Sequence, residues 1–333
     1  MKDVVLGLDI GGTYSKMGLI DAEGRVVAAG KFSTHSQEPI EVFLDELATF
    51  YHEMEKLADE PVRLVAVGCC APNANQFDGT MVHPHNFRWG EIVPLRERLI
   101  AQFNRPVVVA NDANASAVGE QRFGAAKGFQ SFIVLTLGTG LGSGIILNGE
   151  LLLGKNGLAG EMGHTVAKLD GRQCNCGKRG CLETYASATG IRRTIFKLLA
   201  DMNELSPLRQ QNYNDLTAKA IAEAALGGDE IAIEAFAYTG IFLGTKMGEL
   251  ISIFNPEAII LAGGLAKAGD LLLQPALAHM DAHTFPPLRG TCAVKLSQIE
   301  GANAAVLGVG AMGWYLVDPT EDLVPDAPAA GEL

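Results

Sequence analysis

The chain has 333 residues, of which 48% are hydrophobic and 39 are glycine, so it is long enough for two domains with large cores and many tight turns. Acidic residues outnumber Lys and Arg by 38 to 26, and no basic block stands out, which argues against nucleic acid as the main partner because phosphate backbones are bound by clustered positive charge. No run resembles a membrane span, residues 1–5 lack the features of a secretory signal, and six cysteines suit a reducing compartment, so we expect a cytoplasmic protein without membrane partners.

The N-terminal part of the chain predicts a strand meander followed by alternating helices and strands. Hydrophobic runs separated by tight turns predict strands over 4–9, 16–20 and 25–31. Apolar residues at helical spacing predict a helix over 40–57. After these we expect a strand over 64–68, a polar loop to about residue 89, a helix over 93–103 and a strand over 107–110.

A second block repeats this pattern, with a strand over 132–137, a glycine turn over 138–143 and a return strand over 144–147. Further elements are expected in this order: helices over 218–225 and 230–254, strands over 258–262 and 294–298, and a helix over 302–316. The repetition predicts two α/β domains with mixed sheets around a hinged cleft. We expect the smaller domain to comprise residues 1–113 and 301–317, the larger one residues 114–300, and residues 318–333 to form a loose tail.

Glycines follow the first strand in the segment from Asp9 to Lys16, which reads DIGGTYSK. Bare backbone lets N–H groups approach phosphate oxygens closely, and Asp9 at the strand end could orient a magnesium ion through water. The other interpretation is a plain hairpin turn with a solvated acid.

Two later segments have the same character. Residues 136–144 read TLGTGLGSG, and alternating glycines leave one face of a loop open to phosphate groups, although a structural turn remains the alternative. The spacing is not that of a dinucleotide-binding G-x-G-x-x-G fingerprint, and the chain has no P-loop motif. The segment Ala262-Gly263-Gly264 follows an apolar strand and would give adenine and ribose room, but by itself it is explained as a strand-to-helix turn.

A metal site is predicted by one histidine and three cysteines in a short stretch. His164 is followed by Cys174, Cys176 and Cys181 within the segment CNCGKRGC, which supplies a tetrahedral Cys₃His ligand set for a structural zinc ion. Three ordinary thiols in a loop are the alternative. Glu161 precedes this cluster, and the next acid after Cys181 is Glu183, so a zinc-tied loop would hold two carboxylates suited to vicinal sugar hydroxyls.

Asn111 and Asp112 follow a predicted strand between the two halves of the chain. A carboxylate at that place could accept the proton of a substrate hydroxyl during attack on phosphorus. Judged locally, Asp112 is better explained as the N-cap of the helix expected from about residue 113.

Taken together, these residues resemble the ROK family (repressors, open reading frames, kinases), and the resemblance covers about residues 4–316. It implies the two-domain actin-like ATPase fold, which is related to ribonuclease H, and binding of ATP with Mg²⁺. The three glycine segments resemble the ATP-binding elements of that superfamily. The residues to which this role is carried over are Asp9, Gly11, Gly12, Thr13, Lys16, Thr136, Gly138, Thr139, Gly140, Gly263 and Gly264.

The resemblance also implies site residues and a substrate class. It makes the chain an ATP-dependent hexose kinase of glycolysis, with glucose as the leading substrate, Asp112 as the catalytic base and structural zinc on His164 and the three cysteines. The implied sugar contacts are Asn86, Asn111, Asp112, Glu161, His164 and Glu183, and His164 would use one ring nitrogen for zinc and turn the other to the sugar.

Two segments depart from the family pattern and leave the choice of sugar open. A histidine separates Pro84 from Asn86, and APNAN at residues 71–75 replaces the commoner Gly-Pro-Val-Asp, as in a subset of ROK glucokinases. The alternatives are a kinase for N-acetylmannosamine, N-acetylglucosamine or fructose, or a sugar sensor without turnover. The repressor branch carries an N-terminal helix-turn-helix domain, whereas this sequence begins at the first ATPase strand. The family also implies a homodimer or homotetramer.

Overall fold

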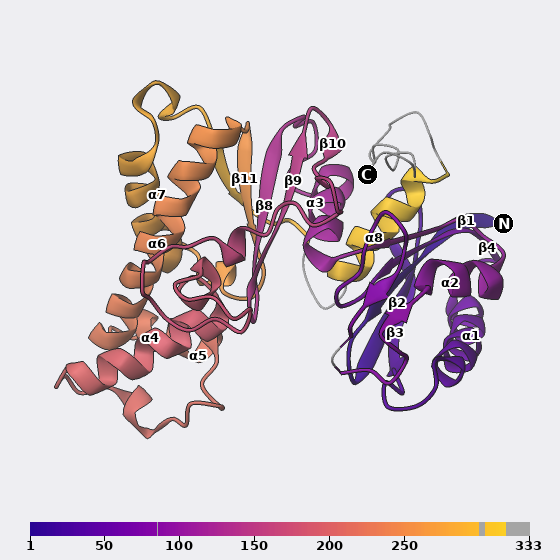
Figure 1. Ribbon diagram of the computed structural model, residues 1–333, viewed down its shortest axis with the longest axis horizontal. Helices are drawn as coiled ribbons and strands as arrows, with labels where there is room; N and C mark the ends of the chain where they lie inside the picture. Colours follow the sequence, from indigo (N-terminus) through magenta and orange to yellow (C-terminus); the bar gives the residue numbers. More distant parts are fainter. Residues whose placement is uncertain (85, 300–303, 318–333) are drawn as a thin grey trace. The chain divides into compact units, whose positions relative to one another are not determined.

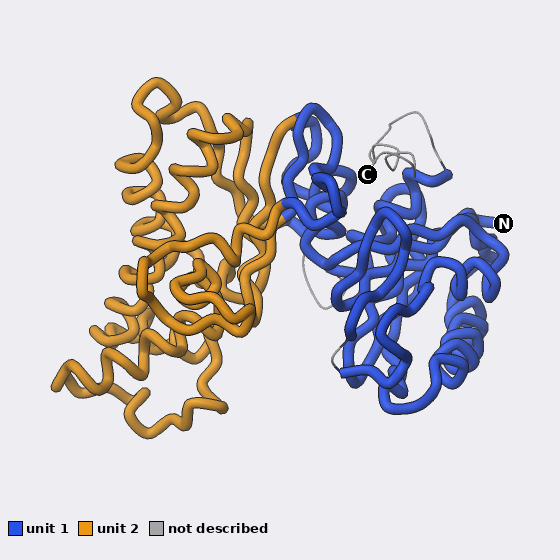
Figure 2. Tube along the Cα trace, in the orientation of Figure 1, with its two compact units in different colours: residues 1–130, 144–159, 298–333 blue, residues 131–143, 160–297 orange. Residues whose placement is uncertain are grey.

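The computed structural model describes residues 1–84, 86–299 and 304–317. The chain forms two compact units, shown in blue and orange in Figure 2. Unit 1 contains residues 1–130, 144–159 and 298–333, and unit 2 contains residues 131–143 and 160–297. The predicted domain boundaries near residues 113 and 301 stay a prediction. The predicted tail at 318–333 and the first residues of the predicted last helix lie outside the described residues.

Unit 1 is built on a mixed five-stranded sheet with the strand order β3 (Val26–Ser33), β2 (Tyr14–Ile20), β1 (Lys2–Ile10), β4 (Val62–Cys70) and β7 (Val107–Ala110). β1 pairs antiparallel with β2 and parallel with β4, and β4 pairs parallel with β7. The parallel strands therefore end at one edge, where β1 delivers Asp9 and β7 leads into Asn111 and Asp112.

Helices cover both faces of this sheet (Figure 1). α1 (Ile40–Leu57) and α2 (Leu95–Phe103) share one core with alternate residues of β1 such as Leu6, while α3 (Asp112–Phe123) and α8 (Ala304–Tyr315) pack together on the other side. Val5 points to that second face, where it meets Trp314 of α8. Successive strand residues point to opposite faces of the sheet, so β1 packs against the helices on both faces.

Two short strands correct the sequence analysis. β5 (Met81–Val82) pairs with β6 (Ile92–Val93), so the expected polar loop contains a small ribbon. The helix predicted over 93–103 begins only at Leu95, because Pro94 disfavours the helical conformation of the residue before it.

The second five-stranded sheet has the order β10 (Glu150–Leu151), β9 (Leu141–Leu147), β8 (Phe132–Leu137), β11 (Ala258–Ala262) and β12 (Ala293–Leu296). In unit 2, β11 pairs parallel with both β8 and β12. β9 begins in unit 2 and continues into unit 1, where it pairs antiparallel with β10. This sheet is mixed as well, in agreement with the prediction.

Unit 2 carries the other described α-helices: α4 (Ala188–Asp201), α5 (Ala218–Leu226), α6 (Glu230–Phe254) and α7 (Asp270–His283) (Figure 1). The predicted bounds of α6 and β11 are confirmed, whereas the sequence analysis did not identify α4 or α7. Short 3₁₀ helices complete the unit: η1 (Met162–His164), η2 (Leu182–Thr184), η3 (Pro207–Gln210), η4 (Ala266–Ala268) and η5 (Pro286–Leu288).

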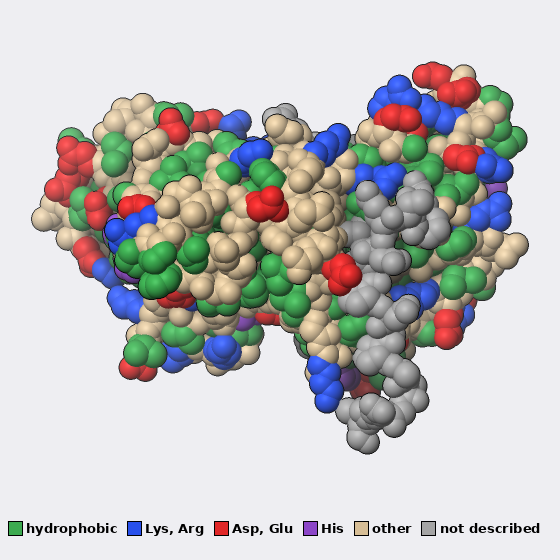
Figure 3. All heavy atoms as spheres, turned by 90° about the horizontal axis from the view of Figure 1, so that it is seen from above, with side chains coloured by type: hydrophobic (Ala, Val, Ile, Leu, Met, Phe, Trp, Pro, Cys, Tyr) green, Lys and Arg blue, Asp and Glu red, His purple; other side chains and the backbone are tan. Residues whose placement is uncertain are grey.

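On the face drawn in Figure 3, the coloured side chains of Lys and Arg are interspersed with those of Asp and Glu. Among the described residues, no helix combines the length and apolar character that crossing a bilayer requires.

Candidate functional site

The predicted site residues fall into two groups, one in each unit. In unit 1, β1 ends in the turn of Gly11 and Gly12, and β2 returns with Lys16 directly opposite Asp9 in the register. A β-carbon on Gly11 would lie 2.5 Å from the carbonyl oxygen of Tyr14, so this tight turn needs glycine. Asn86 lies beside the turn, since its Cβ would be 3.7 Å from a β-carbon on Gly12.

The Asp9 carboxylate is held on both oxygens. Its Oδ2 lies 3.7 Å from Nζ of Lys16, which makes an ion pair that is open to solvent. Its Oδ1 accepts a hydrogen bond from the thiol of Cys70 at 3.2 Å. Sequence reasoning missed Cys70, although its place at the end of the strand adjacent to β1 was a usable signal.

At the start of α3, Asn111 makes the helix cap and Asp112 does not. Oδ1 of Asn111 accepts the backbone N–H of Asn114 at 2.7 Å, so Asn111 is the N-cap. Asp112 is the first helical residue, and its carboxylate does not make that cap. The local explanation of Asp112 as the helix cap is therefore wrong, and the catalytic interpretation stays a prediction.

The surroundings of Asp112 raise the pKa of its carboxyl group above the ordinary aspartate value. Protein atoms packed around the carboxylate are the main cause, the negative charge of Asp9 adds to it, and nearby backbone N–H groups oppose it. The residue is nevertheless exposed to water, so solvent screening limits the rise.

In unit 2, the glycine turn joins β8 to β9 and lies against the start of α4. The N–H of Ala188 donates to the carbonyl oxygen of Gly138 at 2.9 Å, and the N–H of Thr189 donates to that of Thr139 at 3.4 Å. Thr136 stands near the end of β8, opposite Ala262 of β11. The side chain of Thr139 is exposed, as a phosphate-binding role would require.

The two glycines after β11 differ in their surroundings. Gly263 has a φ of +92°, and a β-carbon there would come within 2.6 Å of the carbonyl oxygen of Leu137. Gly264 has open space where a side chain would stand. The positive φ and the close carbonyl oxygen thus require glycine at position 263. Gly264 leaves backbone exposed, without a side chain, next to the end of β8.

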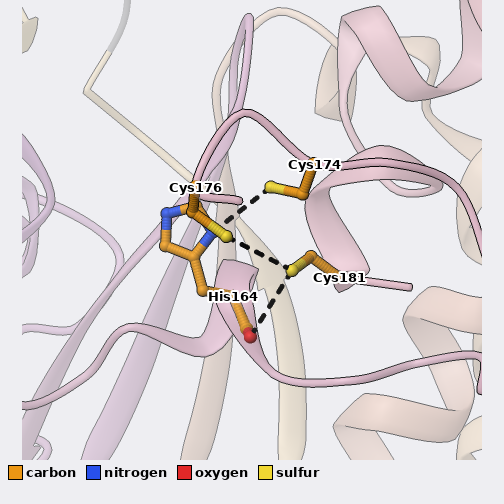
Figure 4. A group of neighbouring side chains, drawn as sticks. All are labelled: His164, Cys174, Cys176 and Cys181. Carbon is orange, nitrogen blue, oxygen red and sulfur yellow. Dashed lines mark hydrogen bonds between the residues drawn. The ribbon is translucent and has the colours of Figure 1, made fainter. Parts of the chain in front are cut away.

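The predicted metal ligands are gathered in unit 2. The ligand atoms of His164, Cys174, Cys176 and Cys181 all lie within 4.8 Å of one another. Figure 4 shows one ring nitrogen of His164 directed at the sulfurs and the other turned away from them. All six cysteines are free, so no disulfide competes for these thiols.

Two of the distances between the ligand atoms match those around a tetrahedral zinc ion. Zinc with sulfur at about 2.3 Å and nitrogen at about 2.0 Å separates two sulfurs by about 3.7 Å and a sulfur from the nitrogen by about 3.5 Å. The Sγ atoms of Cys176 and Cys181 are 3.7 Å apart, and Nδ1 of His164 lies 3.7 Å from Sγ of Cys174. The N–H of Lys178 is the main cause of a lowered pKa at the Cys176 thiol, whereas burial raises the pKa of the Cys174 and Cys181 thiols.

Glu183 connects this cluster to the glycine turn. Its Oε1 lies 3.1 Å from Sγ of Cys174 and 3.8 Å from Nδ1 of His164. Its Oε2 accepts the N–H of Leu141 at 3.4 Å and would be 2.5 Å from a β-carbon on Gly140. Because Gly140 lacks that carbon, the carboxylate can lie between the two predicted binding elements.

Glu161 precedes η1 and is exposed to solvent. The segment behind it is anchored by Ser143, whose hydroxyl accepts the N–H of Met162 and donates to the carbonyl oxygen of Gly160. A β-carbon on Gly163 would collide with the carbonyl oxygen of Leu141. The backbone between Glu161 and His164 therefore packs directly on the start of β9.

A second residue that sequence reasoning missed is Arg172, which fastens the cysteine loop to α4. Its guanidinium donates to the carbonyl oxygens of Thr184 and Gly190 and to Oγ1 of Thr194, and it stacks 4.6 Å from the ring of Tyr185. The backbone N–H of Arg172 also donates to the Tyr185 hydroxyl. No sequence motif marks this arginine, because its partners belong to later elements.

Comparison with known proteins gives a consistent result along most of the chain. The family model described as the ROK family matches residues 5–314. A glucokinase of Halalkalibacterium halodurans is 36% identical over 315 residues, which cover 92% of this chain and 93% of that protein.

Two solved structures share the fold. A ROK family glucokinase from Streptomyces griseus in complex with glucose and AMPPNP has 32% sequence identity and a TM-score of 0.76, covering 93% of this chain and 99% of that one. A ROK family transcriptional regulator has 26% identity and a TM-score of 0.84, covering 96% of this chain and 79% of that one. The predicted actin-like α/β fold is thereby confirmed.

Proposed function

The chain belongs to the ROK family, and from this premise we propose that it transfers the γ-phosphoryl group of ATP to glucose, forming glucose 6-phosphate. The observation that carries the proposal is the likeness to a glucokinase over 92% of the chain. The relative solved with glucose and AMPPNP supports both substrates.

Asp112 acts as the catalytic base in this proposal. It takes the proton of the attacking sugar hydroxyl as the oxygen approaches the γ-phosphorus. Its carboxylate suits the task because Asn111 makes the helix cap and because its pKa is raised towards the working pH. Asn111 keeps its amide N–H₂ group for the sugar, since only its oxygen is used by the cap.

Nucleotide-binding residues are proposed for each unit separately. In unit 1 we propose Asp9, Lys16 and the backbone of Gly11, Gly12 and Thr13. In unit 2 the proposed residues are Thr136, Gly138, Thr139, Gly140, Gly263 and Gly264. Asp9 would hold a magnesium ion through water, and that ion, when bound, offsets negative charge on the phosphates.

Sugar binding is assigned to Asn86, Asn111 and Asp112 in unit 1 and to Glu161, His164 and Glu183 in unit 2. The nitrogen of His164 that points away from the sulfurs is the one proposed to meet the sugar (Figure 4). His164, Cys174, Cys176 and Cys181 would hold a zinc ion with four protein ligands, and the ion would serve as a structural tie for the loop.

Two alternatives follow from specific observations. The departures around Asn86 leave N-acetylmannosamine, N-acetylglucosamine and fructose as possible substrates. The ROK family regulator shares the fold at a TM-score of 0.84, so a sugar sensor without turnover is the second candidate function.

The deciding experiment measures ADP release with ATP and Mg²⁺ across glucose, mannose, fructose, N-acetylglucosamine and N-acetylmannosamine, with Asp112→Asn beside the wild type. We expect turnover on glucose and a loss of roughly a hundredfold or more in kcat in the variant. Near-normal turnover in Asp112→Asn would remove Asp112 as the base. No turnover on any sugar by folded, zinc-loaded protein would favour the sensor.

We further propose that the protein works in the cytoplasm as a homodimer or homotetramer. Free cysteines arranged as a metal site support a reducing compartment.

A further inference from the structure

A buried thiol contacts the carboxylate that we assign to nucleotide binding. Cys70 is the last residue of β4 and lies opposite Asp9 of β1 in the parallel register. Its side chain is only 1% exposed, and its thiol donates to Oδ1 of Asp9 at 3.2 Å. On the other side, Cys70 pairs with Ala110 of β7, the strand that leads to Asn111 and Asp112.

We propose that Cys70 is a positioning residue that fixes the orientation of the Asp9 carboxylate for binding magnesium and nucleotide. The inference rests on the proposed function and extends it to a residue outside the predicted site. Lys16 approaches Oδ2 of Asp9 at 3.7 Å while Cys70 bonds Oδ1, so both carboxylate oxygens have a neighbour that restricts rotation.

A thiol is suited to this task because it donates a hydrogen bond without adding charge. Burial raises the pKa of Cys70 well above the ordinary thiol value, and the negative charge of Asp9 adds to the effect, so the donor hydrogen is retained at neutral pH. A thiol therefore adds no positive charge at Oδ1 of Asp9, whereas a lysine or arginine at this place would add one.

The chain provides a matched control in the adjacent residue. Cys69 is fully buried in the same strand, and its thiol donates to the backbone carbonyl oxygen of Cys70 at 3.7 Å instead of to a carboxylate. The two cysteines thus share residue type, strand and burial but differ in their contact with Asp9.

The test compares Cys70→Ala, Cys70→Ser and Cys69→Ala in the full chain. Steady-state kinetics give KM for Mg·ATP, KM for glucose and kcat, and calorimetry measures ADP binding with and without Mg²⁺. We expect Cys70→Ala to raise KM for Mg·ATP and the Kd of Mg·ADP by roughly three- to tenfold, the range for one ordinary hydrogen bond, because a thiol is a weak donor. KM for glucose should change less than about twofold, Cys70→Ser should recover most of the loss, and Cys69→Ala should behave as the wild type.

A double-mutant cycle asks whether Cys70 acts through Asp9. In the Asp9→Asn background, Cys70→Ala should have little further effect on Mg·ADP binding. Equal effects of Cys70→Ala and Cys69→Ala, or a full Cys70→Ala effect in the Asp9→Asn background, would overturn the proposal. If Cys70→Ala does not fold, a tenfold loss of Mg·ADP affinity in Cys70→Ser, which retains a donor, would also contradict it.

Failure of the proposed function gives a different pattern. Wild-type protein without sugar turnover but with Mg²⁺-dependent ADP binding would end the kinase assignment, and the calorimetric comparison would still decide the role of Cys70. Wild-type protein without Mg²⁺-dependent ADP binding would overturn both.

Discussion

At the scale of single residues, the start of α3 shows that the helix cap made by Asn111 leaves the carboxylate of Asp112 available. Asp and Asn are both common helix caps, and the sequence offers them side by side as Asn111 and Asp112. The cap is made by Asn111, whose oxygen accepts the N–H of Asn114. Asp112 then lies in the first turn with its carboxylate available. Its activity as the proposed base should therefore depend on whether that carboxylate is ionised.

The raised pKa of Asp112 predicts the pH dependence of the reaction. A base works only when ionised, so lowering the pH through the raised pKa should decrease kcat/KM about tenfold per pH unit. This decline should begin at a higher pH than the ordinary aspartate value of about 4 would give. The measurement is kcat/KM for glucose between pH 4.5 and 8.

The control for this prediction is Asp112→Asn. Its residual rate should lack the acidic decline, and its melting temperature at neutral pH should not fall, because the substitution removes a charge that its surroundings disfavour. An unchanged acidic limb in the variant would assign the titration to another group.

At the scale of elements, the loop of η1, the three cysteines and η2 is joined to both predicted ligand sites. Glu183 contacts the cluster through Oε1 and the start of β9 through Oε2. Arg172 ties the same loop to α4, whose first N–H groups hold the glycine turn. If this loop is held in one conformation, we therefore expect it to fix the position of the nucleotide-binding turn as well as that of the sugar ligands.

We predict one zinc ion per chain and a broad effect of its removal. Cys176→Ala should lower the free energy of unfolding by about 2 kcal/mol or more, because metal binding is linked to folding. It should also weaken glucose binding and, through Glu183, nucleotide binding. The measurements are metal analysis of the native protein, thermal unfolding and calorimetric titration with each ligand.

Cys292→Ala is the matched control, since Cys292 lies in unit 2 outside the cluster and its thiol bonds the carbonyl oxygen of Ala293. It should retain zinc and both affinities. Native protein without zinc would refute the metal site, and unchanged sugar affinity in a zinc-free variant would limit the loop to a role in stability.

At the scale of the whole molecule, the two units are each assembled from separate stretches of chain. The last described helix, α8, packs against β1, β4 and β2 of unit 1, and Trp314 donates to the carbonyl oxygen of Ile20 at 3.2 Å. Segments almost three hundred residues apart thus complete one core, so we expect truncation before α8 to prevent folding of unit 1.

The proposed assembly is tested by molar mass in solution. A homodimer or homotetramer should have two or four times the chain mass of 35.2 kDa when measured by light scattering during gel filtration. A mass of one chain at micromolar concentration would contradict the family-based expectation. The molar mass of the wild-type protein should be measured with and without glucose, to show whether the assembly depends on the sugar.

Several features of this protein were determined by the sequence alone because their signals are local. Hydrophobic periodicity predicted the bounds of α6 and β11, and the spacing from His164 to Cys181 predicted the metal cluster. Glycines next to β8 predicted the turn that follows it, but β9 begins at Leu141, inside the turn expected over 138–143. Local signals gave the wrong result where adjacent residues both fitted the pattern or restricted it. Because of Pro94, α2 begins at Leu95 and not at residue 93, and the N-cap of α3 is Asn111 and not Asp112.

Only the tertiary structure decided which distant residues meet. Cys70 and Asp9 are 61 positions apart, and Glu183 and Leu141 are 42 apart. Their contacts depend on the register between β1 and β4 and on the packing of the cysteine loop against β9. Register is selected by the burial of whole strand faces in a shared core, so no short stretch of sequence contains it.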